Sequence, residues 1–378
     1  MPKKTKILFL TLNTFSLTGG IEKVCCSLAK VLEDLSAQIK GFYFNLYAMH
    51  DPQSALDTRY INPQHFKGFK NQKARFGLSS IFTGINSDIV ILSHINLLIL
   101  AYLIKNISPK TRIILLAHGI EIWRALPTWK RKFLQEKTEI WAVSKYTATK
   151  LTVMHQINAE HIKVVHNCLD PYFDIPSNFE KPDALLSRYK LLREQPILFT
   201  LTRLSSQETY KGYDRVFSAL PSLIKKFPNL HYLLAGKADQ DELNRVRNII
   251  NELNLTKYIT LVGFINDDEL TSYFKLGSVF IMPSTMEGFG IVFIEAAACG
   301  TQIIAGNADG SADALLDGAL GTLINPLNVE EIESAIEKNL TEKVDPHHIQ
   351  NLCIANFAYN GYLKKIKELI VTNPKKAA

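Results

Sequence analysis

The sequence contains little cysteine and no long hydrophobic run, and both absences narrow its class. Its 378 residues include five cysteines, an odd number without C-x-x-C spacing, so neither a disulfide framework nor a zinc site is predicted. The most apolar stretch, residues 89–104, is interrupted by polar side chains and is shorter than a membrane-spanning helix of roughly 20 residues. The apolar run at residues 7–12 is too short for a signal-peptide core. We therefore expect a cytoplasmic protein without a transmembrane segment.

The sequence also lacks internal repeats, low-complexity tracts and the G-x-G-x-x-G fingerprint of dinucleotide-binding domains. Its composition, 47% hydrophobic and 21% charged residues, is typical of globular proteins and excludes disorder and a coiled coil. At about 100–200 residues for each domain, the length predicts two domains.

Acidic residues are scarce in the first half of the chain. Residues 1–170 carry 22 basic and 11 acidic residues, a net charge of +11, whereas the remainder carries a net charge of −4. This asymmetry favours an anionic, extended partner such as a membrane leaflet or a nucleic acid. A basic face that contacts only solvent is the alternative.

Short β-branched runs alternate with amphipathic helical patterns along most of the chain, which predicts parallel α/β layers. A proline-rich region at residues 170–195 interrupts the alternation and is interpreted as a linker. The fold predicted is therefore two doubly wound, Rossmann-like domains, at residues 1–175 and 190–354, facing one another across a cleft. A final helix, predicted over residues 349–371, is expected to pack back on the first domain with about residues 355–378.

The strongest motif lies in residues 283–300, PSTMEGFGIVFIEAAACG, after a predicted strand and at the start of a predicted helix. Gly288 and Gly290 allow backbone N–H groups to approach a ligand closely. Glu287 and Glu295 are spaced so that they could accept hydrogen bonds from separate hydroxyl clusters of one ligand. The alternative is that Glu287 is a helix N-terminal acid and Glu295 a solvated or paired residue.

This segment resembles the E-x7-E motif of the retaining GT-B glycosyltransferases, especially glycosyltransferase family 4. Arg203 and Lys211, which precede the motif, are similar to the paired basic residues with which that family holds the donor diphosphate. Fixed cations of this kind stabilise the charge that develops on a leaving diphosphate more in the transition state than in the ground state. The resemblance implies a GT-B fold.

Two features of the first half extend the resemblance. Gly19 and Gly20 follow the first predicted strand and resemble the family's glycine loop, which abuts the donor phosphate and the acceptor; a turn-forming glycine pair is the alternative. His118 follows another strand and resembles the family's histidine at the reaction centre, although a lone histidine is more often structural. At the end of a strand and before a glycine, His118 is well placed to contact a sugar hydroxyl.

The resemblance implies roles for fourteen residues in all. Those with an implied catalytic role are His118, Arg203, Lys211 and Glu287. Those with an implied role in donor binding are Gly19, Gly20, Gly236, Lys237, Gly263, Phe264, Gly288, Phe289, Gly290 and Glu295.

The implied activity is transfer of a hexose, with retention of anomeric configuration, from a UDP- or GDP-sugar to an acceptor hydroxyl. A lipid-linked or growing glycan in envelope or exopolysaccharide biosynthesis is the expected acceptor. No carboxylate pair is spaced as a nucleophile and an acid/base couple, so a same-face displacement is expected.

Asp239 and Asp241 match a metal-binding D-x-D pattern, but they begin a helical pattern, where acids complement the helix dipole. No metal and no cofactor are expected.

Two basic segments, residues 65–75 and 124–137, also contain aromatic residues, a composition typical of segments that lie on anionic leaflets. They favour a peripheral location on the inner face of the cytoplasmic membrane; the alternative is a solvated face whose aromatics lie in the core.

Two other functions remain open. A GT-B nucleotide-sugar epimerase would share the donor site but need further catalytic acids. A nucleic-acid-binding protein is disfavoured by the acidic second half and the absence of a known motif, so no nucleic-acid partner is expected.

Overall fold

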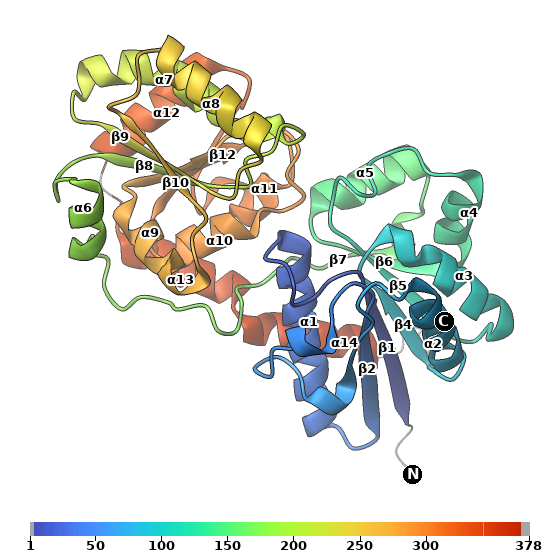
Figure 1. Cartoon of the computed structure of the whole chain (residues 1–378). Coiled ribbons are helices and arrows are strands. Elements are labelled where there is room, and N and C mark those ends of the chain that lie inside the picture. Colours follow the sequence, from blue (N-terminus) through green and yellow to red (C-terminus); the bar gives the residue numbers. More distant parts are fainter. Residues whose placement is uncertain (1–3, 343, 372–378) are drawn as a thin grey trace. The chain divides into compact units, whose positions relative to one another are not determined.

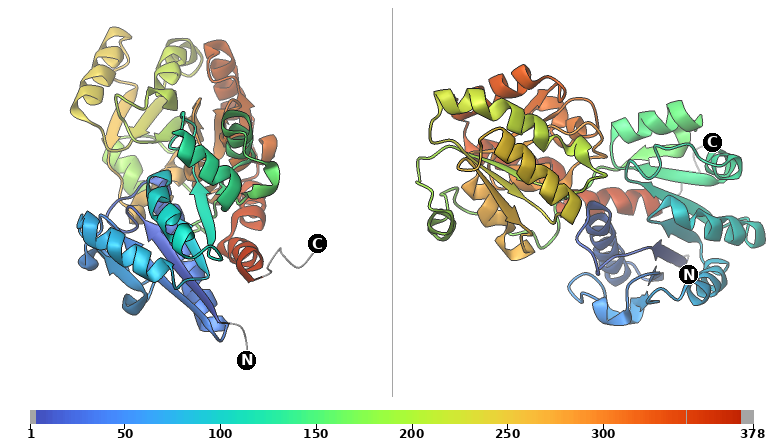
Figure 2. Two further views of the ribbon diagram at one scale, coloured as in Figure 1. Left: turned by 90° about the vertical axis from the view of Figure 1, so that its right-hand side faces the viewer. Right: turned by 45° about the horizontal axis from the view of Figure 1, so that its top comes forward.

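The computed structural model describes residues 4–342 and 344–371 and divides the chain into two compact domains. The first domain extends to Pro171 and resumes at Tyr359, and the second spans Tyr172–Ala358. Figures 1 and 2 show that each domain is a sheet with helices on its two faces. The prediction of two doubly wound α/β domains is confirmed. None of the described helices combines the length and apolar composition needed to cross a membrane.

The first domain contains a parallel sheet in the order β3-β2-β1-β4-β5-β6-β7. The order reverses between β1 and β4, which is the place where open α/β sheets bind ligands. The strands are β1 (Thr5–Thr11), β2 (Phe42–Ala48), β3 (Phe66–Gly68), β4 (Ile89–Leu92), β5 (Arg112–Ala117), β6 (Thr138–Ala142) and β7 (Ile162–Val164).

Helices cover both faces of this sheet. One face buries a single apolar core beneath α2 (Lys73–Gly84), α3 (Leu98–Ile107), α4 (Thr128–Lys137) and α5 (Lys145–His155). Because right-handed crossovers that run in opposite directions place their helices on opposite faces, α1 (Gly20–Gln38) covers the other face. Helix α14 (Tyr359–Val371) packs beside α1, and the Tyr359 hydroxyl donates to Asp34 at 2.7 Å.

The second domain contains a parallel sheet in the order β10-β9-β8-β11-β12-β13, which reverses between β8 and β11. Its strands are β8 (Ile197–Leu201), β9 (His231–Ala235), β10 (Ile259–Gly263), β11 (Val279–Met282), β12 (Gln302–Gly306) and β13 (Thr322–Ile324). Its helices are α6 (Asp183–Tyr189), α7 (Tyr213–Lys226), α8 (Gln240–Glu252), α9 (Leu270–Leu276), α10 (Ile291–Ala298), α11 (Ser311–Ala314), α12 (Val329–Thr341) and α13 (Pro346–Phe357).

Short 3-10 helices complete the described elements. They span Gln53–Ala55, Pro63–His65, Ile95–Leu97, Ala159–His161, Thr209–Lys211, Asp267–Glu269 and Leu316–Gly318.

Three details differ from the sequence-based expectations. The final helix predicted over residues 349–371 is two helices, because Ala358 has extended backbone angles, with φ −64° and ψ 146°, that end α13. The linker region contains α6. In residues 65–75, the strand β3 forms and Phe66 and Phe69 are buried, Phe69 against Phe76 at a ring-centroid distance of 5.3 Å. For residues 65–75 the structure therefore supports the alternative, in which the aromatic residues lie in the core.

Candidate functional site

The candidate site of the second domain lies at the carboxyl ends of β8, β9, β10 and β11. Because these strands are parallel, their carboxyl ends share one edge of the sheet. Arg203 follows β8, Lys237 follows β9, Phe264 follows β10 and Glu287 follows β11. Four of the residues singled out in the sequence thus lie along the edge where a doubly wound sheet binds its ligand.

The centre of this edge is an ion pair between Lys211 and Glu287. The Lys211 Nζ lies 2.5 Å from the Glu287 Oε2, and the two side chains are 14% and 18% exposed. Burial by itself would lower the pKa of the Lys211 ammonium, but the charge of Glu287 overcomes it and raises that pKa above its usual value. Lys211 is therefore a fixed cation beside a fixed acceptor.

Close backbone packing brings the two loops together. Gly212 has φ +83°, and a Cβ there would lie 2.1 Å from the carbonyl oxygen of Pro283. The backbone N–H of Thr285 donates to the carbonyl oxygen of Tyr210 at 3.0 Å. Only glycine allows this approach, so the Lys-Gly pair of the sequence places Lys211 directly against the loop that carries Glu287.

Asp309, which follows β12, holds the Glu287 loop from its other side. Its side chain is 2% exposed and accepts hydrogen bonds from the backbone N–H of Glu287 at 2.6 Å and of Ser311 at 2.9 Å. The N–H of Gly310 donates to the carbonyl oxygen of Glu287 at 2.8 Å. Burial raises the pKa of the Asp309 carboxyl to about 6. Sequence reasoning missed Asp309, because a lone aspartate after a strand carries no distinguishing pattern.

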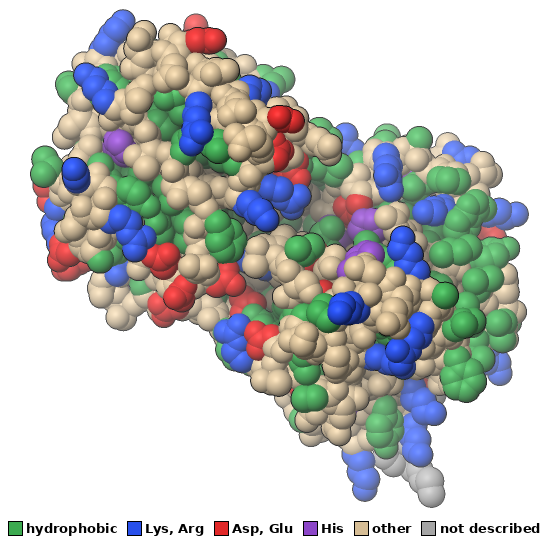
Figure 3. Space-filling model, in the orientation of Figure 1, with side chains coloured by type: hydrophobic (Ala, Val, Ile, Leu, Met, Phe, Trp, Pro, Cys, Tyr) green, Lys and Arg blue, Asp and Glu red, His purple; other side chains and the backbone are tan. Residues whose placement is uncertain are grey.

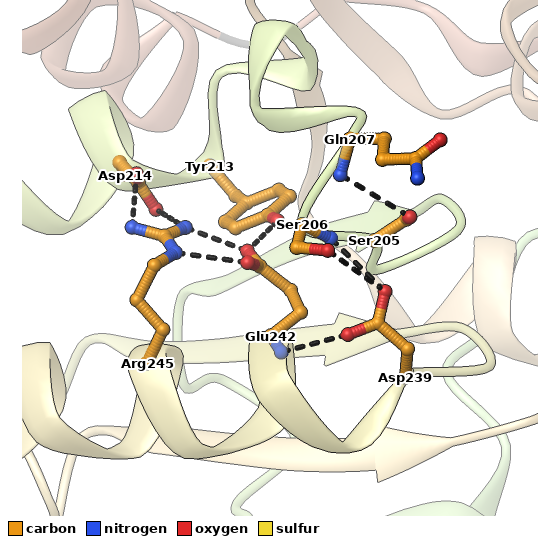
Figure 4. A network of polar contacts seen from close by, with 8 residues as sticks. All are labelled: Ser205, Ser206, Gln207, Tyr213, Asp214, Asp239, Glu242 and Arg245. Atoms are coloured by element: carbon orange, nitrogen blue, oxygen red, sulfur yellow. Dashed lines mark hydrogen bonds and ion pairs between the residues drawn. The ribbon is translucent and has the colours of Figure 1, made fainter.

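Helix α8 fixes the segment from Ser205 to Asp214, which includes Lys211 (Figure 4). Asp239 caps this helix by accepting from the N–H of Glu242 at 2.8 Å, and it also accepts from the N–H of Ser206 at 3.0 Å. These two hydrogen bonds lower the pKa of Asp239. Asp239 therefore acts as a helix cap and a loop anchor. Its position at the start of a helix was predicted from the sequence, and its contact with the loop was not.

The second anchor of α8 lies one turn further on. Arg245 contacts Glu242 at 2.6 Å and Asp214 at 2.8 Å, and Glu242 accepts a hydrogen bond from the Tyr213 hydroxyl (Figure 4). Glu242 is fully buried. Tyr213 is two residues from Lys211, so this network holds the end of the lysine loop; it was not found from the sequence.

The other candidate residues at this edge of the sheet are mostly more exposed to solvent than Lys211 and Glu287. Arg203 is exposed and contacts Glu208 at 3.0 Å, and Lys237 is also exposed. Gly236 has φ +140°, and a Cβ there would lie 1.6 Å from the carbonyl oxygen of Thr202, so β8 and β9 converge at this point. A Cβ at Gly263 would meet nothing within 4 Å, and Phe264 is exposed.

The residues that follow Glu287 in the E-x7-E segment are more buried than a ligand-binding role suggests. Gly288 and Gly290 are buried, and Glu295 is buried within α10. The Phe289 side chain is also buried, against Phe357 at a ring-centroid distance of 5.7 Å. Phe289 is therefore a core residue, and only its backbone could contact a donor.

The candidate residues of the first domain follow β1 and β5. Gly19 precedes α1 with extended backbone angles, and Gly20 is exposed. The His118 Nε2 lies 3.0 Å from the carbonyl oxygen of Ser93, so this nitrogen carries the proton and Nδ1 is an acceptor. Burial lowers the pKa of His118, although the charge of Glu121 opposes the shift. A neutral imidazole with a free acceptor nitrogen can bind a hydroxyl group.

Two family models match the chain. The model "Glycosyltransferase Family 4" matches residues 18–173, and the model "Glycosyl transferases group 1" matches residues 187–352. Together the two matches include most of both domains and leave out residues 174–186 between them.

Curated relatives named as mannosyltransferases match a smaller part of the chain. The chain is 29% identical over 241 residues to the GDP-mannose-dependent alpha-(1-6)-phosphatidylinositol monomannoside mannosyltransferase of Mycolicibacterium smegmatis, which covers 60% of each protein. It is 25% identical over 207 residues to the serotype-specific mannosyltransferase WbdA of Escherichia coli, 54% of this chain and 24% of that one. The chain thus spans about 60% or less of the length of these relatives.

Solved structures match along nearly the whole chain. HepE of Anabaena, solved in complex with UDP and glucose, superposes with a TM-score of 0.78 and 20% identity over 98% of this chain and 100% of its own. WaaG, a glycosyltransferase involved in lipopolysaccharide biosynthesis, superposes with a TM-score of 0.64 and 14% identity over 97% and 100%. These similarities show the GT-B fold, and with both family models they show that the chain belongs to glycosyltransferase family 4.

Proposed function

We propose that this protein transfers a hexose from a UDP- or GDP-sugar to an acceptor hydroxyl, with retention of anomeric configuration. The observation that carries the proposal is the partly buried contact of Lys211 with Glu287, at the edge of the sheet where the strand order reverses. A cation and an acceptor oxygen fixed side by side match the two chemical halves of a nucleotide sugar, an anionic diphosphate and a ring of hydroxyl groups.

Lys211 and Arg203 bind the diphosphate in this proposal. As the bond between the sugar and the phosphate breaks, negative charge grows on the departing phosphate oxygen, and the two cations stabilise it. Arg203 must exchange its contact with Glu208 for the phosphate, whereas Lys211 is already held in place. The cations supply this charge stabilisation from the protein, so transfer is expected to continue in the presence of EDTA.

Glu287 accepts hydrogen bonds from the donor sugar, and Glu295 is assigned to the ribose. His118, through Nδ1, accepts a hydrogen bond from the sugar near C6. No carboxylate is assigned as a nucleophile. The acceptor hydroxyl attacks on the face from which the diphosphate leaves and passes its proton to the departing phosphate oxygen, which accounts for retention.

The relatives suggest which donors and acceptors to test first. Two of them are named as mannosyltransferases, one GDP-mannose-dependent and acting on a phosphatidylinositol monomannoside. GDP-mannose is therefore the first donor to test, with UDP-glucose second, because HepE was solved with UDP and glucose. A lipid-linked or growing glycan at the inner face of the cytoplasmic membrane is the proposed acceptor.

The test is incubation of the whole protein with a panel of UDP- and GDP-sugars and candidate lipid-linked acceptors, with nucleoside diphosphate release and product mass as readouts. We expect release with one donor class and a glycosylated product whose anomeric configuration, read by NMR, matches the donor. Inversion would overturn the assignment of retention. A changed nucleotide sugar without a glycosylated product would instead support the epimerase alternative.

The variant Lys211→Met tests the site itself, with Lys225→Met, an exposed lysine of α7, as the matched control. We expect Lys211→Met to reduce turnover by at least about 100-fold and the control to match the wild type. Turnover at the wild-type level in a folded Lys211→Met protein would refute the role of Lys211.

A further inference from the structure

The helix layer formed by α2, α3, α4 and α5 carries almost no negative charge. These four helices contain nine lysine and arginine residues and one acid, Glu136. Helix α1, on the other face of the same sheet, contains two lysines and three acids. These helices therefore carry a net charge of +8, most of the net charge of +11 in residues 1–170.

The same layer exposes large apolar side chains. Leu78 and Phe82 of α2 are each 72% exposed, and the neighbouring helices add Ile99, Leu103, Ile107 and Trp129. Figure 3 shows hydrophobic and basic side chains intermixed on the side of the first domain where Figure 1 places α2, α3 and α4. Scattered exposed apolar residues are ordinary, but a gathered set marks a site of association.

Close helix packing makes these residues one surface. A Cβ at Gly84 of α2 would lie 2.4 Å from the side chain of Ile104 of α3, so the two helices approach closely. The rings of Tyr102 in α3 and Trp129 in α4 are 5.7 Å apart. The outer faces of α2, α3 and α4 therefore adjoin without an intervening loop.

We propose that this surface docks on an anionic lipid leaflet, a proposal that rests on the lipid-linked acceptor proposed above. Basic side chains such as Arg75 and Arg131 would lie at the lipid headgroups, while Leu78 and Phe82 would enter the boundary with the acyl chains. Charge complementarity selects the leaflet over a second copy of the chain, because two copies of this layer would repel each other. The exposed aliphatic side chains select it over a nucleic acid, which offers them no apolar partner.

The docking surface belongs to the domain that also carries His118. A lipid-linked acceptor would be confined to the leaflet that this domain contacts, which raises its local concentration without any increase in its affinity for the site. Docking and sugar transfer are separable at Leu78 and Phe82, because both lie on α2 and none of the candidate site residues lies on that helix.

The test is flotation of the whole protein with vesicles of phosphatidylcholine alone and of phosphatidylcholine with phosphatidylglycerol. We expect binding to the second kind only, and weaker binding as the salt concentration rises. The double variant Leu78→Ser/Phe82→Ser should lower the partition coefficient at least about tenfold. Leu192→Ser/Leu327→Ser, which alters exposed leucines of the second domain, is the matched control and should bind like the wild type.

A second pair separates charge from apolar contact. Arg131→Ser/Lys137→Ser should weaken binding to the anionic vesicles, whereas Lys364→Ser/Lys365→Ser, on α14, should not. Equal binding of the wild type and both docking variants would overturn the proposal. So would absence of binding to either vesicle, self-association that the docking variants abolish, or binding to RNA instead. Donor turnover without vesicle binding would refute the docking surface and leave the proposed transfer standing.

Discussion

The two domains share one fold but use their cations differently. In the second domain, Lys211 and Arg245 are held by carboxylates at 2.5–2.8 Å, and both belong to the network around one loop. In the first domain, the cations of α2–α5 share a single acid among four helices. Fixed cations suit a site that must stabilise charge at one position, and scattered cations suit a surface that meets many equivalent headgroups. In a doubly wound domain, the edge of the sheet thus suits a site that stabilises charge, and the helix layer suits a surface that contacts lipid headgroups.

The largest effect that would test this contrast is loss of the fixed pair through Glu287→Gln. The amide keeps the size of the side chain but leaves the Lys211 ammonium without its counter-charge, so we expect kcat/KM for the donor to fall at least about 100-fold. The measurement is steady-state nucleoside diphosphate release. Glu252→Gln, at the exposed end of α8, is the control, and equal losses in the two variants would argue against a role for the fixed pair.

Removal of the α8 anchor should have a smaller effect. Glu242→Gln weakens the contacts of a fully buried carboxylate with Arg245 and Tyr213. We expect the free energy of unfolding to fall by about 3 kcal/mol and the donor KM to rise about tenfold, because the lysine loop is held less firmly at Tyr213. Urea denaturation and donor kinetics measure the two quantities. A loss of stability with an unchanged KM would show that the anchor serves the fold alone.

The pH dependence of stability should reveal Asp309. A carboxyl whose pKa is raised in the folded protein binds more protons there than in the unfolded chain, so stability decreases as pH rises through the interval between the two pKa values. With a folded pKa of about 6 and an unfolded value near 3.8, this contribution is about 3 kcal/mol between pH 4 and pH 6.

The variant Asp309→Asn should lack this component. Subtraction of its unfolding free energy from that of the wild type, measured by chemical denaturation at pH 4.5, 5.5 and 7, isolates the contribution. A difference that does not change with pH would contradict the effect of burial on Asp309. Asp183→Asn, an exposed residue of α6, is the control.

The smallest effect is expected from the scattered cations. Arg131→Ser/Lys137→Ser should change donor turnover with a detergent-solubilised acceptor by less than about twofold, because exposed charges contribute little at a distance and are screened by salt. A larger decrease without membranes would show that the helix layer takes part in donor chemistry and would remove the contrast between the domains.

Much of this organisation could be predicted from the sequence. The alternation of β-branched runs with amphipathic patterns is a local property, so it predicted the strands and the two doubly wound domains. Gly288 and Gly290 marked the loop of Glu287 as one that could approach a ligand, whereas the contact of Lys211 with Glu287 was not predicted. Segment β3 escaped prediction because its sequence, Phe66-Lys67-Gly68, has no β-branched residue and ends in glycine, which is depleted in strands.

The residues that escaped prediction act through contacts between distant parts of the chain. Asp309 lies 22 residues from the backbone group that it accepts from, and Glu242 lies 29 residues from Tyr213. No spacing rule connects such positions, because the sheet order rather than the sequence brings them together. The exposed leucine and phenylalanine of α2 were missed for a similar reason, since periodicity assigns apolar residues to the core.

The position of α14 has a consequence for biosynthesis. The first domain buries Tyr362, Ile366 and Ile370 of this helix, yet the whole second domain is translated before them. At about 5–20 residues per second, the ribosome needs roughly 10–40 s to add the intervening segment Tyr172–Ala358. During that interval the apolar surface on which α14 packs stays exposed in the nascent first domain. This domain is therefore complete only after the second domain has been synthesised.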